Sequence, residues 1–264
     1  MAGLMGSDPV LSVIIPCLNE AAHLPLLLAD LDRWPGALER LVIDAGSEDG
    51  SADLARRAGA HCLLAPQRGR GAQLAFGADQ ARGAWLLFLH ADSRLSSRWP
   101  QAVMAVLNEP ADTQAAWYFD LRLQPSRPGL RLLSTAVAMR SRWLQRPYGD
   151  QGLLLHRRLY AACGGYAALP LMEDLDLVER LSARTRLRAL DDALISDSRR
   201  WSDTGLIQQS WRNAQLRSRW RRGENPDRLA TAYYGKAEDV PADQEAYQKP
   251  QRWPWGSNSQ PSRS

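Results

Sequence analysis

The stretch LLFLHADSR, residues 86–94, decides the fold of this chain. Its first four residues are apolar, as is typical of a buried strand, and the apolar run stops abruptly at His90-Ala91-Asp92. A strand with a carboxylate at its carboxyl end is the usual construction of a ligand site in a parallel α/β sheet. Taken alone, Asp92 is better explained as a helix cap with Ser93 as its turn partner. Two upstream strands end in the same way, and this agreement favours a ligand site.

Both upstream strands are followed by polar side chains. The first strand is predicted over 11–15, and we expect Pro16 to end it because proline cannot donate to a strand ladder. Asn19 and Glu20 then open a run with helical spacing. The second strand ends on Asp44, and a turn rich in Gly, Ser and Asp follows it. Capping explains one such strand end more easily than three.

The alternation of short apolar runs with helical spacing predicts an α/β fold with a mostly parallel central sheet and helices on both faces. In the first half we expect strands near 11–15, 40–44, 61–65 and 84–89. The intervening and following segments predict helices near 20–33, 49–59, 70–82 and 97–108. The rhythm changes after about residue 110, where the sequence predicts a strand over 115–123, a helix over 128–144 and a strand over 153–156.

Composition limits the class of protein. With 264 residues and 45% hydrophobic content, the chain suits one large domain with additions. No apolar run is long enough to cross a bilayer and the N-terminus lacks a signal pattern, so we expect a cytoplasmic protein. The three cysteines are widely spaced, which disfavours a disulfide framework or a zinc site. Residues from about 236 onward show no periodicity.

The segment 199–222 is rich in arginine and tryptophan, which raises the alternatives of nucleic acid and of a membrane surface. However, Trp211 and Trp220 lie nine residues apart, on roughly opposite sides of a helix. We therefore expect no nucleic-acid partner, and peripheral membrane contact is not favoured. One tryptophan is expected to pack on the domain, while the arginines line an anionic pocket or lie in solvent.

Taken in order, these motifs resemble the family 2 glycosyltransferases over about residues 11–200. The matching segments are SVIIPCLNE (12–20), VIDAGSEDGS (42–51), GRGAQ (69–73) with Gly77, HAD (90–92) and Glu173-Asp174. FLHADS, the GRGAQ segment and a late Asn-Ala-x-x-Arg helix further resemble a bacterial branch linked to arsenosugar biosynthesis.

The resemblance implies a single Rossmann-like, nucleotide-sugar-binding domain of the GT-A type over 11–235, with a C-terminal helical extension. Within it we expect a nucleotide-binding half at 11–110, an acceptor half at 111–200 and C-terminal helices at 201–235. A flexible N-terminus at 1–10 and a disordered tail at 236–264 complete the predicted organisation.

Donor-binding roles follow from the same resemblance. The positions expected to bind the nucleotide are Pro16, Asn19, Glu20, Asp44, Arg70 and Ala91. A guanidinium suits phosphate oxygens because its donors form a planar fork. A solvated arginine in a basic loop with Arg68 is the competing interpretation of Arg70. Glycines 69 and 71 allow close approach to a ligand, although the chain has no phosphate loop of the G-x-x-x-x-G-K-[ST] type.

A divalent metal, Mg²⁺ or Mn²⁺, is implied at Asp92, which matches the last acidic residue of the family's D-x-D motif. The metal would neutralise charge on the leaving diphosphate. His90 stands where many relatives carry the first aspartate, and imidazole is a poorer ligand for a hard cation. His90 is therefore also a candidate to hydrogen-bond a phosphate or a ribose hydroxyl.

The general base implied by the family is Asp174, with Glu173 nearby to orient or tune it. Acidic residues in the first turn of a helix also stabilise that helix, which is the competing explanation. We expect Asp176 to face elsewhere. Asp150 and Gln151 match a loop on the acceptor side, although a plain turn would use the same residue types.

The predicted reaction is inverting transfer of a sugar from a nucleoside-diphosphate sugar, with UDP favoured over GDP, to an acceptor hydroxyl. QLRSRW (215–220) lacks the spacing of the Q-x-x-R-W motif of processive synthases, so a non-processive enzyme is expected. The alternatives are a non-catalytic nucleotide-sugar-binding protein and a sugar nucleotidyltransferase, although PCLNE (16–20) is a poor substitute for the latter's Gly-rich loop. The sequence indicates neither the sugar, the acceptor nor an oligomeric state.

Overall fold

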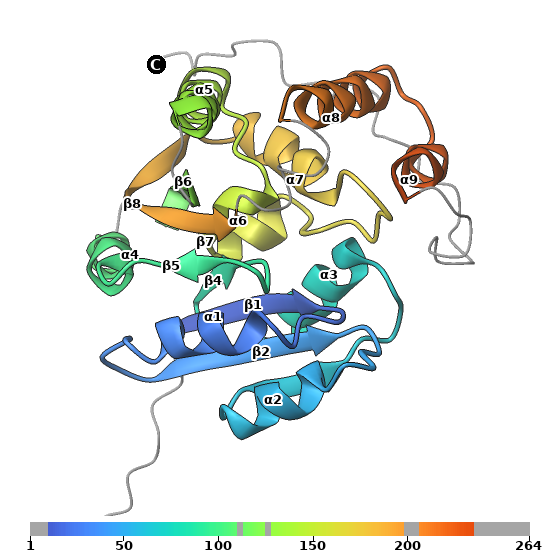
Figure 1. Ribbon diagram of the computed structural model, residues 1–264. Coiled ribbons are helices and arrows are strands. Elements are labelled where there is room, and N and C mark those ends of the chain that lie inside the picture. Colours follow the sequence, from blue (N-terminus) through green and yellow to red (C-terminus); the bar gives the residue numbers. More distant parts are fainter. Residues whose placement is uncertain (1–9, 110–112, 125–127, 198–205, 235–264) are drawn as a thin grey trace, which may run out of the picture.

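The computed structural model describes residues 10–109, 113–124, 128–197 and 206–234. Across these ranges, eight strands form one mixed sheet in the order β3-β2-β1-β4-β7-β6-β8-β5 (Figure 1). The strands are β1 (Leu11–Cys17), β2 (Leu38–Asp44), β3 (His61–Leu64), β4 (Trp85–Phe88), β5 (Arg94–Leu95), β6 (Ala116–Gln124), β7 (Leu153–His156) and β8 (Leu187–Asp197). The helices are α1 (Leu24–Leu31), α2 (Ser51–Arg57), α3 (Arg70–Gln80), α4 (Trp99–Leu107), α5 (Pro128–Leu144), α6 (Arg157–Ala162), α7 (Glu173–Ser182), α8 (Leu206–Arg221) and α9 (Pro226–Tyr234), with a short 3₁₀ turn η2 (Gly149–Gln151).

The predicted α/β class is confirmed, and β1 to β4 form a parallel block. The expectation for Pro16 was wrong, because β1 continues to Cys17 and Pro16 pairs in register with Ile43 of β2. The pairing of β1 with β4 ends at Ile14. Pro16 therefore lies beyond that ladder, where a missing N–H group leaves no partner strand unsatisfied.

Two hydrophobic cores cover the two faces of the sheet, because successive side chains of a strand point to opposite faces. Val13 and Ile15 belong to the core shared with α1, α2 and α4, whereas Ile14 belongs to the core shared with α3, α6 and α7. Every residue of β1 is buried, as expected of a central parallel strand covered on both faces. The predicted helices on both faces are confirmed.

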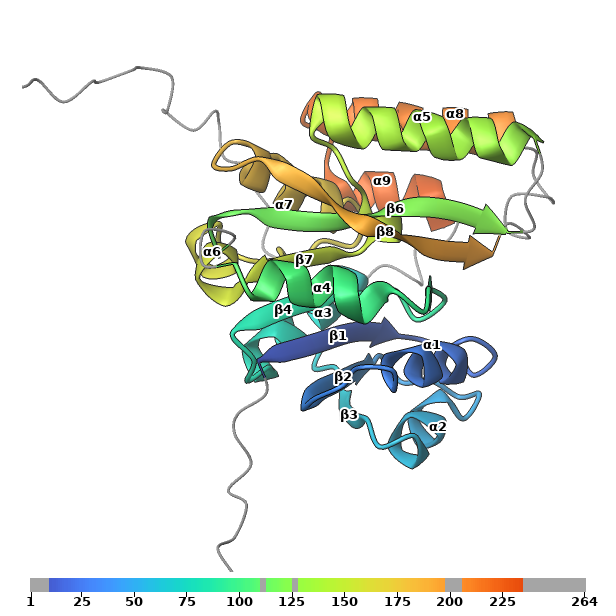
Figure 2. The same ribbon diagram turned by 90° about the vertical axis from the view of Figure 1, so that its left-hand side faces the viewer.

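The second half of the sheet is mixed. β7 runs antiparallel to both β4 and β6, while β6 and β8 are parallel to each other with an irregularity between Tyr118 and Asp120. Helix α5 packs on β6 through a separate small core. Figure 2 shows α5 and α8 on the same side of the molecule, above the sheet. Another cluster joins α8 and α9 to the start of α7.

Some predictions concern parts of the chain beyond these elements. The predicted flexible segment 1–10 and the predicted tail 236–264 lie outside the described residues, except for Val10. Among the helices of the described ranges, none is long and apolar enough to cross a bilayer. The cytoplasmic location stays a prediction.

Candidate functional site

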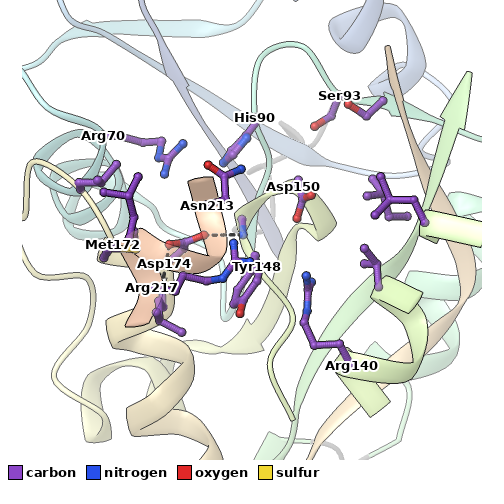
Figure 3. Close-up of a pocket in the computed structure, with 18 of the residues that line it drawn as sticks. Arg70, His90, Ser93, Arg140, Tyr148, Asp150, Met172, Asp174, Asn213 and Arg217 are labelled. Atoms are coloured by element: carbon purple, nitrogen blue, oxygen red, sulfur yellow. Dashed lines mark hydrogen bonds between the residues drawn. The ribbon is translucent and has the colours of Figure 1, made fainter. Parts of the chain in front are cut away.

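A cavity of about 440 Å³ lies at the carboxyl end of β4, between the sheet and helices α3, α5, α7 and α8 (Figure 3). This is the edge of an α/β sheet at which ligands usually bind. Five predicted site residues line the cavity: Arg70, His90, Asp92, Asp150 and Asp174. The sequence therefore indicated residues from four separate segments that converge on one cavity.

The end of β4 supplies two of these side chains. His90 and Asp92 are half-buried and line the cavity, and Ser93 beside them is buried in its wall. Ala91 points the other way and belongs to the hydrophobic core on the α1 side, so it does not line the cavity. The alternation along the chain thus delivers His90 and Asp92 to the same space.

Helix α3 is fixed to the sheet by Gln73. Its buried amide nitrogen donates to the carbonyl oxygens of Cys17 at 3.0 Å and of Ile43 at 2.7 Å, which belong to β1 and β2. At Gly71, a Cβ would lie 2.9 Å from the backbone nitrogen of Leu169, so glycine allows that close approach. These two contacts determine where Arg70 stands at the first turn of α3.

Arg70 forms an ion pair with Glu173 across the cavity wall. Glu173 is 1% exposed, whereas the Arg70 side chain is 37% exposed and lines the cavity. Burial raises the pKa of Glu173 above its usual value, and the Arg70 guanidinium opposes that rise. Met172, directly before Glu173, has a φ of +69°, a backbone strain that is most common at functional sites.

Asp174, Gly149 and His90 meet at one point. The backbone N–H of Gly149 donates to Asp174 Oδ2 at 2.8 Å, and that of Leu175 donates to Oδ1 at 2.7 Å. A Cβ on Gly149 would lie 2.8 Å from His90 Nε2 and 3.2 Å from Asp174 Oδ2. The missing side chain at Gly149 therefore allows the end of β4 and the start of α7 to approach each other (Figure 3).

The far part of the cavity is built around the Tyr148 ring. The guanidinium of Arg140, from α5, lies 3.8 Å from its centre, and that of Arg217, from α8, lies at 4.9 Å. Burial raises the pKa of Asp150 above its usual value, and Arg140 opposes that rise. Asp150 Oδ1 is buried and accepts no hydrogen bond from the described residues. The wall of this part of the cavity therefore contains a carboxyl group with one buried oxygen that has no hydrogen-bond partner among the described residues.

The remaining wall of the far part is apolar. It is formed by residues of β6 and of the inner side of α5: Leu121, Leu123, Leu133, Ala136 and Val137. Several of them also belong to the small core between α5 and β6, so they hold the helix in place as well as lining the cavity.

Four residues predicted to bind the nucleotide lie outside the cavity lining: Pro16, Asn19, Glu20 and Asp44. They lie at the carboxyl ends of β1 and β2 and in the following loop. Asp44 Oδ2 accepts from the backbone N–H groups of Gly46 and Ser47, both at 3.0 Å. Asn19 receives a hydrogen bond from the backbone of Glu48 at 2.9 Å. The Asp44 contacts stabilise the loop after β2, and the Asn19–Glu48 contact joins that loop to the loop after β1 at the same edge of the sheet.

The structure also places Gln151, which was predicted on the acceptor side, and Asp176, which was expected to face away from the site. Gln151 is fully buried, and its amide oxygen accepts from Ser141 at 2.7 Å and Arg140 at 3.0 Å, while its nitrogen donates to the Phe119 carbonyl at 3.1 Å. Gln151 therefore connects η2 to α5 and β6 and does not line the cavity. Asp176 is buried against Arg180, which confirms that it faces elsewhere.

Sequence patterns did not single out Arg140 or Tyr148 as lining residues, whereas Gly149 belongs to the loop that was matched to the acceptor side. Asn213 and Arg217 are the Asn and Arg of the Asn-Ala-x-x-Arg helix, which was noted for its resemblance to the arsenosugar branch and not as part of a site. No local pattern marks Arg140, because it is one of several arginines in a helix. Gly149 and Tyr148 lie directly beside Asp150, so the turn predicted there was the available signal.

The residues fit a divalent cation that is shared with a substrate. No group of three His, Cys, Asp or Glu side chains in the described ranges could form a cage for a metal ion. Mg²⁺, however, is often held by one or two carboxylates together with substrate phosphates. Asp92 in the cavity wall, with His90 beside it, meets that smaller requirement.

Comparison with known proteins identifies similar sequences. The family model described as "Glycosyl transferase family 2" matches residues 12–168. The PGL/p-HBAD biosynthesis glycosyltransferase of Mycobacterium bovis (strain BCG / Pasteur 1173P2) is 36% identical over 114 residues, which cover 39% of this chain and 44% of that protein. The match thus covers less than half the length of that relative. The arsenosugar branch stays a prediction.

Solved structures share the fold. The mannosyltransferase PcManGT from Pyrobaculum calidifontis, in complex with GDP-Man and Mn²⁺, has a TM-score of 0.59 and 20% identity, over 91% of this chain and 66% of that one. S. aureus TarS 1-349 in complex with UDP has a TM-score of 0.58 and 17% identity, over 71% and 60% of the two chains. At these identities the likeness shows the fold alone.

Proposed function

The chain belongs to glycosyl transferase family 2, and from this premise we propose that it transfers a sugar from a nucleoside-diphosphate sugar to an acceptor hydroxyl. The observation that carries the proposal is the convergence of Arg70, His90, Asp92 and Asp174 on one cavity at the carboxyl edge of the sheet. A nucleotidyltransferase or a passive binding protein has no need of an oriented carboxylate facing a second, apolar part of the cavity.

We place the donor along the carboxyl edge of β1, β2 and β4. The nucleoside lies at the loops that carry Asn19 and Asp44, and the diphosphate extends towards Arg70 and Asp92. The buried Glu173 carboxylate holds the Arg70 fork in position, which suits bidentate binding of phosphate oxygens. UDP is favoured over GDP, although TarS binds UDP and PcManGT binds GDP-Man.

A divalent cation, Mg²⁺ or Mn²⁺, would be held by Asp92, with His90 beside it. When bound, it supplies positive charge that stabilises the departing diphosphate. PcManGT was solved with Mn²⁺, which supports the expectation. The imidazole of His90 lines the same cavity and is proposed to contact a phosphate or a ribose hydroxyl of the donor.

Asp174 is the proposed general base. Two backbone N–H groups, of Gly149 and Leu175, fix the orientation of its carboxylate in the cavity wall. The carboxylate accepts the proton of the acceptor hydroxyl as that oxygen attacks the anomeric carbon from the side opposite the diphosphate. The configuration is inverted, and each transfer releases its product.

The acceptor lies in the part of the cavity around Tyr148 and Asp150. The carboxyl group of Asp150, which lines this part of the cavity, accepts a hydrogen bond from a second hydroxyl of the acceptor. The apolar wall of β6 and α5 suits an acceptor with a hydrophobic portion next to its hydroxyl groups.

The deciding experiment is a panel of nucleoside-diphosphate sugars assayed for nucleotide release, with Mn²⁺ and with a chelator, in the presence and absence of simple alkyl glycosides. Asp92→Ala should lose metal-dependent release. Asp174→Asn should keep donor binding and lose acceptor-dependent transfer by about 10²–10⁴-fold.

Asp191→Asn is the matched control, because Asp191 is 98% exposed and remote from the cavity lining. It should behave like the wild type. Donor binding without turnover by the wild type would favour the non-catalytic alternative. If the wild type neither binds nor turns over any donor of the panel, the proposed function is refuted.

A further inference from the structure

Helix α5 carries an apolar stripe on its solvent side. Leu132 is 73% exposed, Met139 45% and Trp143 75%. Their spacing of seven and then four residues places them on one face of the helix. Single exposed apolar residues are common, but three large ones on one helical face are the usual mark of an interaction surface.

Helix α8 carries another large exposed apolar side chain. Figures 1 and 2 both show α5 and α8 on the same side of the molecule, and the Tyr148 ring contacts one arginine from each helix. Trp211 of α8 is 64% exposed. Its buried counterpart Trp220 confirms that one tryptophan packs on the domain. From sequence, membrane contact was disfavoured because Trp211 and Trp220 lie on opposite sides of one helix. The apolar stripe on α5 is a separate observation that favours membrane contact.

The two helices are strongly basic. They contain seven arginines (Arg131, Arg140, Arg142, Arg212, Arg217, Arg219 and Arg221) and no acidic residue. Carboxylates of neighbouring elements pair with Arg142, Arg219 and Arg221. Arg212, beside the exposed Trp211, donates to the backbone carbonyls of Ala232 and Tyr233, which satisfies its N–H groups without neutralising its charge. Arg140 and Arg217 line the cavity and do not belong to the outer surface. Arg212 keeps its charge beside the exposed Trp211, and the two helices contribute no carboxylate of their own.

We propose that this α5–α8 surface docks on an anionic lipid bilayer. A helix with large apolar side chains on one face and arginines beside them is the usual form of an interfacial membrane anchor. Arginines near an anionic leaflet add attraction that an uncharged surface does not offer. A second copy of this chain fits poorly, because two such surfaces would bring like charges together.

Docking in this way has a consequence for the site, which rests on the proposed function. The inner side of α5 and the residues Asn213 and Arg217 of α8 line the cavity. The helices that would touch the bilayer are therefore the helices that form the wall of the acceptor part. An acceptor with a hydrophobic portion would reach the cavity from the lipid surface without crossing open water.

The test is flotation of the full chain with vesicles of phosphatidylcholine alone and with vesicles that contain about one third phosphatidylglycerol. We expect binding to the anionic vesicles, weaker binding to the neutral ones, and release at high salt. Trp143→Ser and Leu132→Ser should each weaken binding by about tenfold or more, since burying one such side chain is worth about that factor.

Leu64→Ser is the matched control, because Leu64 is 71% exposed but lies on β3 at the opposite edge of the sheet. It should bind like the wild type, and all three variants should keep the wild-type melting temperature. Absence of vesicle binding, or an equal loss in all three variants, would overturn the proposal. The proposal would also be overturned if the wild type does not bind vesicles but forms a dimer that the Trp143→Ser substitution dissociates. Flotation does not depend on catalysis, so failure here is distinct from failure of the transferase assignment.

Discussion

Gly149→Ala tests whether the meeting point of His90 and Asp174 matters for catalysis. The added methyl group would lie 2.8 Å from His90 Nε2 and 3.2 Å from Asp174 Oδ2. Ordinary contacts with carbon begin at about 3.5 Å, so the imidazole must move by roughly 0.7 Å and the carboxylate by about half as much. The backbone of Gly149 lies outside the left-handed region, so alanine can adopt it.

The expected effect on stability is small and that on activity is large. Both groups that must move are the ends of side chains in a cavity wall, so we expect a change of about 1 kcal/mol or less in the free energy of unfolding. A general base displaced by a fraction of an ångström to an ångström can cost about 100-fold in rate. This corresponds to about 2.7 kcal/mol of transition-state stabilisation.

The measurement is kcat/KM for acceptor-dependent transfer together with the thermal melting temperature. Gly129→Ala is the matched control, because a Cβ at Gly129 on α5 meets nothing within 4 Å. That variant should keep wild-type activity and gain slightly in stability, since alanine favours helix. If Gly149→Ala retains more than half of the wild-type kcat/KM, the positions assigned to Asp174 and His90 in the reaction are wrong.

Three further substitutions probe the supports of the site. Gly71→Ala should destabilise the protein by about 2 kcal/mol or more in urea unfolding, because its Cβ would meet rigid backbone at Leu169. Asp150→Asn should stabilise the protein at neutral pH: burial raises the pKa of the wild-type carboxyl, so the native state loses stability as the pH rises through that value, and the gain should vanish in acid where both states are protonated. Trp220→Ala should cost about 3–5 kcal/mol because the side chain is 1% exposed, whereas Trp211→Ala should leave the melting temperature unchanged.

Each of these predictions has a contrary result. If Gly71→Ala unfolds at the same urea concentration as the wild type, the backbone at Leu169 can move away from α3 to make room for the added methyl group. A melting-temperature difference between Asp150→Asn and wild type that is constant with pH would mean that the Asp150 pKa is ordinary. Equal losses in the two tryptophan variants would contradict the packing of α8.

The first half of the fold follows from sequence because β1 and β4 are short, apolar and buried throughout, and β2 is apolar and buried towards its carboxyl end. In the second half the sequence also predicted β6, α5 and β7, with bounds close to those observed, but it did not predict β8. Its sequence LRALDDALISD contains the polar pair Asp191-Asp192, and its partner β6 is irregular between Tyr118 and Asp120. A register irregularity interrupts the alternation that would have marked the strand. The predicted end of β1 at Pro16 was wrong because Pro16 lies beyond the end of the β1–β4 ladder, where a proline does not interrupt pairing with β2.

In the site, residues at strand ends were predicted from the sequence, whereas residues brought together by helix packing were not. Residues at strand ends, such as His90 and Asp92, were found because chain topology alone carries them to the sheet edge. Arg217 and Tyr148 meet Arg140 only through the packing of α5 and α8, which no local pattern encodes. Gln151 was predicted at the site but does not line the cavity. Its amide forms hydrogen bonds with Ser141 and with the Phe119 carbonyl, although its neighbour Asp150 lines the cavity.

The boundary of the family match bears on what specificity this chain has of its own. The match covers residues 12–168, which include the proposed donor positions from Asn19 to Asp92. The proposed base Asp174 and the lining residues Asn213 and Arg217 come after it. The part of the cavity proposed for the acceptor is built from β6, α5 and the turn at Tyr148–Asp150, which lie within the match, and from α7 and α8, which lie wholly beyond it. Substitutions at Arg217 should therefore change which acceptor is used, whereas those at Arg70 should weaken binding of any donor.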